Sequence, residues 1–213
     1  MKLLVFDMDN TLLDGRVIVA LSEELGFERK LSDILDRFRK GDILGYEVSD
    51  YLASLLKGLT PEELIDIVNK IPLSEGIQPV AAELKKRYKI AIVSDSYTIA
   101  ANLIKEKIGA DLVLANILEI ENGKLTGKIL NLYNWSYNRP NCRKHSICKF
   151  EALKMMANSI GLSPEDSIFV GDGPPDACAM QIAGKGIGFN ASPEVREAAD
   201  VIIEDMFQLL DKL

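Results

Sequence analysis

The chain has 213 residues, of which 47% are hydrophobic and 27% charged, and its formal net charge is −7. This length suits one α/β domain, or a core domain with a small second one. The acidic balance argues against a nucleic-acid partner, because such binding depends on neutralising phosphates with Lys and Arg. It leaves room for a small phosphorylated metabolite held at a local cationic site.

No apolar run reaches the roughly 18 residues that a membrane helix needs. The run at the N-terminus is also too short for a signal peptide. Three cysteines make a poor disulfide framework. We therefore expect a cytoplasmic protein without a membrane partner, and the sequence leaves its oligomeric state open.

The first expected element is a buried parallel strand at 3–6, a short run that is apolar on both faces. Asp7 and Asp9 follow it directly, and two carboxylates this close repel each other unless a cation relieves the cost. One Asp can attack phosphorus, and the other can donate and accept a proton. The alternative is that Asp9 and Asn10 are simply turn or cap residues.

The stretch 16–71 carries apolar residues at helical spacing and no strand pattern. Thr60, Pro61 and Glu63 form a capping box with proline at the first helical position. About four consecutive helices are expected here, as a small helical domain inserted after the first strand. We place this domain at 15–73 and the α/β core at 1–14 and 74–213.

A second strand is expected at 90–93, followed by Ser94 and Asp95. A hydroxyl and the next backbone N–H groups at such a turn suit a phosphate oxygen, although Ser94 is an equally good helix cap. A third strand is expected at 111–115. A β-hairpin should follow within 116–130, because Asn122-Gly123 is a strong hairpin signal.

Residues 131–148 show no periodicity and are expected to form an irregular surface segment. Within it, Cys142, His145 and Cys148 have side chains that can ligate zinc, but a structural site needs four ligands. Reduced structural cysteines are the other interpretation. The sequence does not decide between them.

A helix over 149–160 begins with Lys149, which could neutralise a phosphate, although a lysine at a helix start is usually solvated. The strand 167–170 comes next and leads into a glycine-rich turn that carries Asp172 and Asp176. Carboxylates of this kind are typical Mg²⁺ ligands. Asp176 could instead be a residue of the first helical turn, favoured by the helix dipole.

Two last strands are expected at 186–189 and 200–203. Alternating strands and helices predict an α/β fold, with a doubly wound, mostly parallel, Rossmann-like sheet covered by helices on both faces. Such sheets place ligands at the carboxyl ends of their strands. The four aspartates should therefore meet at one edge and form a phosphoryl-transfer site with Mg²⁺ as cofactor.

The order and spacing of these motifs resemble the haloacid dehalogenase-like hydrolases over nearly the whole chain. The insert resembles that family's helical cap, and residues 122–127 resemble its phosphoserine phosphatase branch. The matching pieces are Phe-Asp7-Met-Asp9-Asn-Thr11-Leu, Val-Ser94, Lys149 and Gly171-Asp172-Gly-Pro-Pro-Asp176-Ala-Cys-Ala-Met180.

The resemblance implies a phosphatase in which Asp7 is the nucleophile and a metal ligand. Asp9 would be the general acid and base and would offer its backbone carbonyl to the metal. Asp172 would bind the metal directly. Asp176 would bind it through water, or would support the residues that bind it without being a ligand itself.

The resemblance also implies that Ser94 and Lys149 hold the phosphate and that Thr11 steadies the site. We add Asp95 as a phosphate contact because it follows Ser94, although the family often has glycine there. Arg16 is a further candidate for binding the substrate.

Phosphoserine phosphatases carry a glutamate for the substrate ammonium where this chain has Arg16, and a cap arginine for the carboxylate where it has Leu52. A zwitterionic substrate would lose two charge-assisted bonds. We therefore expect a substrate other than phosphoserine. A phosphomutase or phosphotransferase, and a non-catalytic phosphate-binding regulator, are the alternatives.

Overall fold

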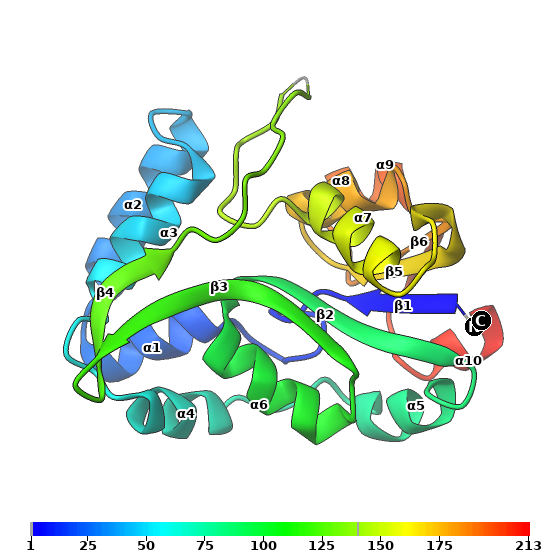
Figure 1. The fold of residues 1–213 in the computed structure, drawn as a ribbon, viewed down its shortest axis with the longest axis horizontal. Coiled ribbons are helices and arrows are strands. Elements are labelled where there is room, and N and C mark those ends of the chain that lie inside the picture. Colours follow the sequence, from blue (N-terminus) through cyan, green and yellow to red (C-terminus); the bar gives the residue numbers. More distant parts are fainter. Residues whose placement is uncertain (1, 140) are drawn as a thin grey trace.

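Seven strands form one sheet in the order β4-β3-β2-β1-β5-β6-β7 (Figure 1). The computed structural model describes residues 2–139 and 141–213. Every neighbouring pair is parallel except β3 and β4, which run antiparallel. The strands are β1 (Lys2–Phe6), β2 (Tyr88–Tyr97), β3 (Leu112–Glu121), β4 (Lys124–Leu130), β5 (Ser167–Gly171), β6 (Lys185–Phe189) and β7 (Val201–Ile203).

The position of β1 determines where a ligand can bind. It lies between β2 and β5, so the chain builds one half of the sheet to one side of β1 and the other half to the opposite side. The carboxyl ends of β1, β2 and β5 therefore meet at the point where the strand order reverses, which is where open α/β sheets place their ligands.

Helices cover both faces of the sheet, as its alternating side chains require. Leu4 and Phe6 point into one apolar cluster, whereas Leu3 and Val5 point into another. The first cluster includes side chains from α5 (Ile77–Leu84), α6 (Thr98–Ile108) and α10 (Gln208–Lys212). The second includes side chains from α7 (Lys149–Ser159), α8 (Pro174–Met180) and α9 (Pro193–Ala198). The doubly wound α/β fold is confirmed.

The predicted run of helices lies between β1 and α5, as α1 (Val17–Leu25), α2 (Glu28–Lys40), α3 (Gly45–Ser54) and α4 (Pro61–Asn69). The capping box of α4 is present, with the Thr60 side chain accepting from the Glu63 N–H. Buried residues of all four helices belong to the same apolar cluster as Leu4 and Phe6. The division at 15–73 stays a prediction. No helix in the described part of the chain is long and apolar enough to cross a membrane.

The hairpin is continuous with the sheet, whereas the sequence predicted a separate strand before it. The expected strand 111–115 and the first arm of the hairpin are one strand, β3, which pairs with β2 at one end and β4 at the other. Asn122 and Gly123 both have positive φ, as a tight hairpin turn requires. Similarly, β2 extends beyond the predicted end at Val93 to Tyr97. Its pairing with β3 is irregular between Val93 and Tyr97 and resumes where Tyr97 pairs with Asn116.

The β4–α7 loop, residues 131–139 and 141–148, has no helix or strand, as predicted. Figure 1 shows it extending between the α2–α3 pair and α8. The carbonyls of Arg143 and Lys144 accept from the N–H groups of Gly45 and Tyr46, at 2.8 and 2.9 Å. These amides open α3 and have no partner within that helix. The loop thereby caps α3.

The close approach of the loop to α3 depends on Gly45. A Cβ there would lie 2.8 Å from the His145 Cα, a backbone atom that cannot move cheaply. We predict that Gly45→Ala lowers the free energy of unfolding by about 1–3 kcal/mol. It should also speed trypsin cleavage after Arg143 and Lys144.

Urea titration and limited trypsinolysis measure these effects. Ser32→Ala, on the exposed face of α2, is the matched control and should leave both unchanged. Wild-type stability and trypsin resistance in Gly45→Ala would contradict a tight contact.

Candidate active site

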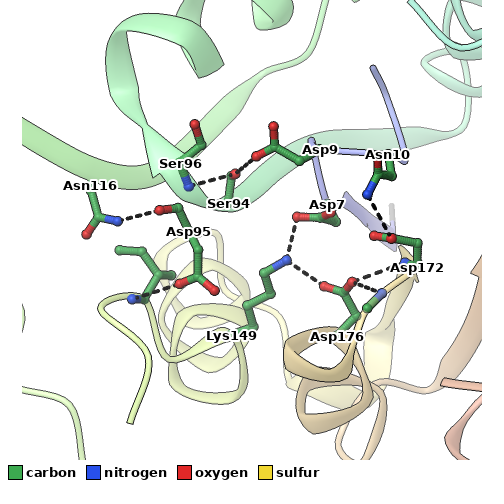
Figure 2. Close-up of polar contacts among 12 residues, drawn as sticks. Asp7, Asp9, Asn10, Ser94, Asp95, Ser96, Asn116, Lys149, Asp172 and Asp176 are labelled. Atoms are coloured by element: carbon green, nitrogen blue, oxygen red, sulfur yellow. Dashed lines mark hydrogen bonds and ion pairs between the residues drawn. The ribbon is translucent and has the colours of Figure 1, made fainter. Parts of the chain in front are cut away.

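Three carboxylates and a lysine meet at the carboxyl ends of β1 and β5 (Figure 2). Asp7 follows β1, and Asp172 follows β5. Asp176 lies in the first turn of α8, and Lys149 opens α7. Of the four aspartates expected to meet at this edge, these three do so.

Lys149 is the cation at the centre of this group. Its Nζ donates to Asp7 Oδ1 and, at 2.6 Å, to Asp176 Oδ1. The three side chains expose at most 7% of their surface. Burial alone would lower the pKa of Lys149, but the carboxylates of Asp176 and Asp7 raise it above its ordinary value. The ammonium therefore stays charged, contrary to the solvated lysine that a helix start usually carries.

The carboxylates are crowded enough to need a further cation. Ligand oxygens of Asp7, Asp172 and Asp176 all lie within 4.8 Å of one another. Burial raises the pKa of Asp7 well above its ordinary value. Lys149 opposes this effect, and repulsion from the neighbouring aspartates adds to it. Burial and Asp176 likewise raise the pKa of Asp172. Hard oxygen donors in this arrangement fit a divalent cation such as Mg²⁺.

Asp176 differs from the other two aspartates because both of its oxygens already have partners. Oδ1 accepts from Lys149, and Oδ2 accepts from the N–H groups of Asp172 and Gly173, at 3.1 and 2.9 Å. A Cβ on Gly171 would lie 2.4 Å from Asp176 Cγ, so only glycine admits this side chain. These bonds favour an indirect contact between Asp176 and a metal.

The Asp9 side chain turns away from Lys149. Its Oδ1 accepts from the Val17 N–H at the start of α1, at 2.6 Å, and its Oδ2 from the Ser94 hydroxyl, at 3.5 Å. Burial raises its pKa, while the bond from Val17 and the charge of Arg16 oppose that effect. A carboxyl held in this way can carry a proton closer to neutral pH than a solvated Asp can.

The other predicted phosphate contacts lie around this centre. Ser94 is buried, and its Oγ accepts from the Ser96 N–H at 3.1 Å. Thr11 is fully buried, and within the described chain its Oγ1 has no partner. Arg16 is exposed and precedes α1. The structure thus gathers Ser94 and Arg16 beside Asp9, with Arg16 at the rim.

Asp95 is engaged differently from a phosphate ligand. Its carboxylate accepts from the Ile147 N–H at 3.1 Å, and its carbonyl from the Asn116 amide at 2.6 Å. Both partners tie the irregular last part of β2, which follows Ser94, to neighbouring segments. Its side chain therefore anchors the β4–α7 loop, and only its backbone suits the role expected for it.

Sequence reasoning missed two residues of the site. Asn10 adopts a positive φ and donates to Asp172 Oδ2 at 3.4 Å. Its position in the turn after Asp9 was a signal for this. Asn116 bonds Asp95 and Ser146. A lone amide in the apolar run of β3 was the available signal for it.

The cysteine–histidine segment does not gather into a metal site. The His145 ring packs on Phe38, with 5.8 Å between ring centroids. Arg139 Nη2 lies 2.7 Å from Cys148 Sγ, which places a cation where zinc would need to be. Among residues 2–139 and 141–213, only the aspartate group above brings three potential metal ligands together.

Known proteins share this sequence and fold. The family model of haloacid dehalogenase-like hydrolases matches residues 4–181. The phosphoserine phosphatase of Methanocaldococcus jannaschii is 35% identical over 204 residues, which cover 95% of this chain and 92% of that protein. That of Wolinella succinogenes is 32% identical over 216 residues and the full length of both. That of Archaeoglobus fulgidus is 36% identical over 93% of this chain, which spans only 55% of the relative.

Solved structures agree with these relatives. A phospho-aspartyl intermediate analogue of phosphoserine phosphatase superposes with a TM-score of 0.81 at 34% identity, covering 100% of this chain and 98% of that one. A substrate-bound phosphoserine phosphatase gives 0.82 at 34% identity and the same coverage. The chain therefore belongs to the haloacid dehalogenase-like hydrolases, in their phosphoserine-phosphatase-like branch, and is a phosphoric monoester hydrolase.

Proposed function

We propose that this hydrolase depends on Mg²⁺ and cleaves a small phosphomonoester through an aspartyl phosphate on Asp7. The observation that carries the proposal is the placement of Asp7, which shares the buried Lys149 with Asp176 while Asp9 faces the other way. One carboxylate is thereby available for attack on phosphorus, and a separate one for proton transfer.

The residues divide the reaction between them in two steps. With the phosphate held by Lys149 and Ser94, an oxygen of Asp7 attacks phosphorus, and the bond to the leaving oxygen breaks. Asp9 gives its proton to that oxygen. Asp9 then takes a proton from water as the water attacks phosphorus, which releases phosphate and restores Asp7. The raised pKa of Asp9, due to burial, favours the protonated form needed in the first step.

Asp7 and Asp172 would hold Mg²⁺ directly, the Asp9 backbone carbonyl would contribute as in the family resemblance, and Asp176 would act through water. When bound, the ion would offset the negative charge that builds on the transferring phosphoryl group. The grouping of their ligand oxygens, which with that of Asp176 all lie within 4.8 Å of one another, supports this assignment.

The substrate we propose is not phosphoserine. Leu52, at the position of the family's cap arginine, is 7% exposed and packs in the apolar cluster. It cannot pair with a carboxylate. Arg16 lies near Asp9 and would repel an ammonium group. It suits an additional anionic or hydroxyl-rich group instead.

The catalytic assignment predicts that Asp7→Asn and Asp9→Asn each lower phosphate release by about a thousandfold or more. Both variants should unfold within a few degrees of wild type, because Asn keeps the shape of Asp and Lys149 retains Asp176. Colorimetric phosphate release and thermal unfolding measure this. Wild-type turnover by Asp7→Asn would refute its role. In isotopically labelled water, a new phosphomonoester that carries no label would favour a transferase over a hydrolase.

The metal assignment predicts that chelation abolishes activity and that Mg²⁺ restores it. At a hundred times its Kd, Mg²⁺ should stabilise the fold by about 2.7 kcal/mol, which is about 5–10 °C in Tm. Asp172→Asn should lose most of this shift, whereas Asp33→Asn, exposed on α2, should keep it. An equal shift in all three proteins would place the ion elsewhere.

The substrate assignment predicts a kcat/KM for phosphoserine at least about tenfold below that of the best phosphomonoester in a panel. Continuous phosphate detection across amino-acid, sugar, nucleotide and glycerol phosphates provides the comparison. A clear preference for phosphoserine would contradict our interpretation of Arg16 and Leu52.

A further inference from the structure

A cavity of about 190 Å³ lies between α3, the β3–β4 hairpin and the β4–α7 loop. Pockets for drug-sized ligands are typically about 300–1,000 Å³, so this one suits a smaller group, about one sugar ring in size. Its aromatic side chains come from α3 and the loop, and are Tyr46, Tyr133, Trp135 and Tyr137.

The lining carries no charged side chain. Besides the aromatic rings it presents three amides, Asn116, Asn131 and Asn134. Each amide both donates and accepts hydrogen bonds, as a hydroxyl group does. A zwitterion or a second anion would find no opposite charge here, whereas a neutral group rich in hydroxyls would find partners and apolar ring faces.

The cavity is linked to the active site through Asn116. Asn116 lines it, and the same amide donates to the Asp95 carbonyl. Asp95 directly follows Ser94, whose hydroxyl reaches Asp9. Figure 2 shows the site residues side by side, with Asn116 and Asp95 at one end of the group and Asp172 at the other. The cavity is therefore connected to Ser94 through one hydrogen bond and one residue of backbone.

The walls of the cavity are held in place by the loop itself. Trp135 Nε1 donates to the Ser146 carbonyl at 2.7 Å, and the Tyr137 hydroxyl donates to the His145 carbonyl at 2.8 Å. Tyr133 stacks on Trp135 with 4.8 Å between ring centroids. Their mutual stacking covers ring surface that a planar base would otherwise use. Such a preformed pocket loses little freedom when a ligand binds.

Two of the amides are available to a ligand. Asn131 and Asn134 line the cavity, and both are exposed. The NH₂ group of Asn116, in contrast, already donates hydrogen bonds to Asp95 and Ser146, so only its carbonyl oxygen can accept a hydrogen bond from a ligand.

We propose that this cavity binds the leaving group of the substrate, and that this group is a neutral, polyhydroxylated ring. The substrate class is then a sugar or cyclic polyol monophosphate. This rests on the proposed function, because it places the phosphate at Asp7 and Lys149.

The test measures kcat/KM for hexose, pentose and inositol monophosphates, adenosine monophosphate, phosphoserine and acetyl phosphate, with Mg²⁺. Acetyl phosphate carries the phosphoryl group but is too small to reach the cavity. We expect a sugar or inositol phosphate to exceed phosphoserine and adenosine monophosphate by about tenfold or more.

The variant for this test replaces both exposed amides, Asn131→Ala with Asn134→Ala. Relative to acetyl phosphate, its kcat/KM for the preferred sugar or inositol phosphate should fall about tenfold, as expected for lost hydrogen bonds. Leu132→Ala is the matched control, because Leu132 lies on the same loop, is 65% exposed and does not line the cavity. It should leave that ratio unchanged.

The outcomes separate the two proposals. Hydrolysis of acetyl phosphate together with a preference for phosphoserine or adenosine monophosphate would overturn the cavity's role alone. An unchanged ratio in the double variant would do the same. Failure to hydrolyse acetyl phosphate as well as the other compounds would overturn both this inference and the proposed function.

Discussion

The site depends on one buried ion pair, in which Lys149 is shared between Asp7 and Asp176. A buried ammonium of this kind is tolerated only when opposite charges surround it, and Asp7 in turn becomes a stable carboxylate only near a cation. Three separate elements, β1, α7 and α8, must therefore meet at one point. The Gly171 position, where a side chain would collide with Asp176, shows how closely the backbone is packed to bring them together.

A second constraint comes from the β4–α7 loop, which ends where Lys149 begins. It bonds α3 through Arg143 and Lys144, and it bonds the last part of β2 through Ile147 and Asp95. The helical insert and the end of β2 are thus joined through one irregular segment that leads directly into α7. A few residues of backbone therefore separate the contact with α3 from Lys149.

The parts that could be predicted from the sequence are those that depend on local chemistry. Buried apolar runs indicated the strands, and the aspartates after two of them indicated the site, because carboxyl ends of parallel strands meet. What could not be predicted depends on contacts distant in sequence. The engagement of Asp95 with Ile147, the turning of Asp9 toward Val17 and the extension of β3 into the hairpin all arise from partners that no periodicity reveals. The irregular loop had no pattern from which its contacts could be inferred.

The distribution of charge also separates the two tasks that a phosphatase must perform. Around phosphorus the chain concentrates charge, with Lys149 and the aspartates in a buried group where electrostatic interactions are strong. Beside it, the cavity walls are neutral and aromatic. Charge near phosphorus stabilises the transition state of any phosphomonoester, so it cannot distinguish among leaving groups. In our proposal, discrimination comes from Arg16, Leu52 and the neutral wall. At that wall an unmatched ammonium or carboxylate would lose its hydration without gaining a partner. Because the β4–α7 loop supplies most of that wall, our proposal implies that changes in this loop alter the substrate while the ion pair stays intact.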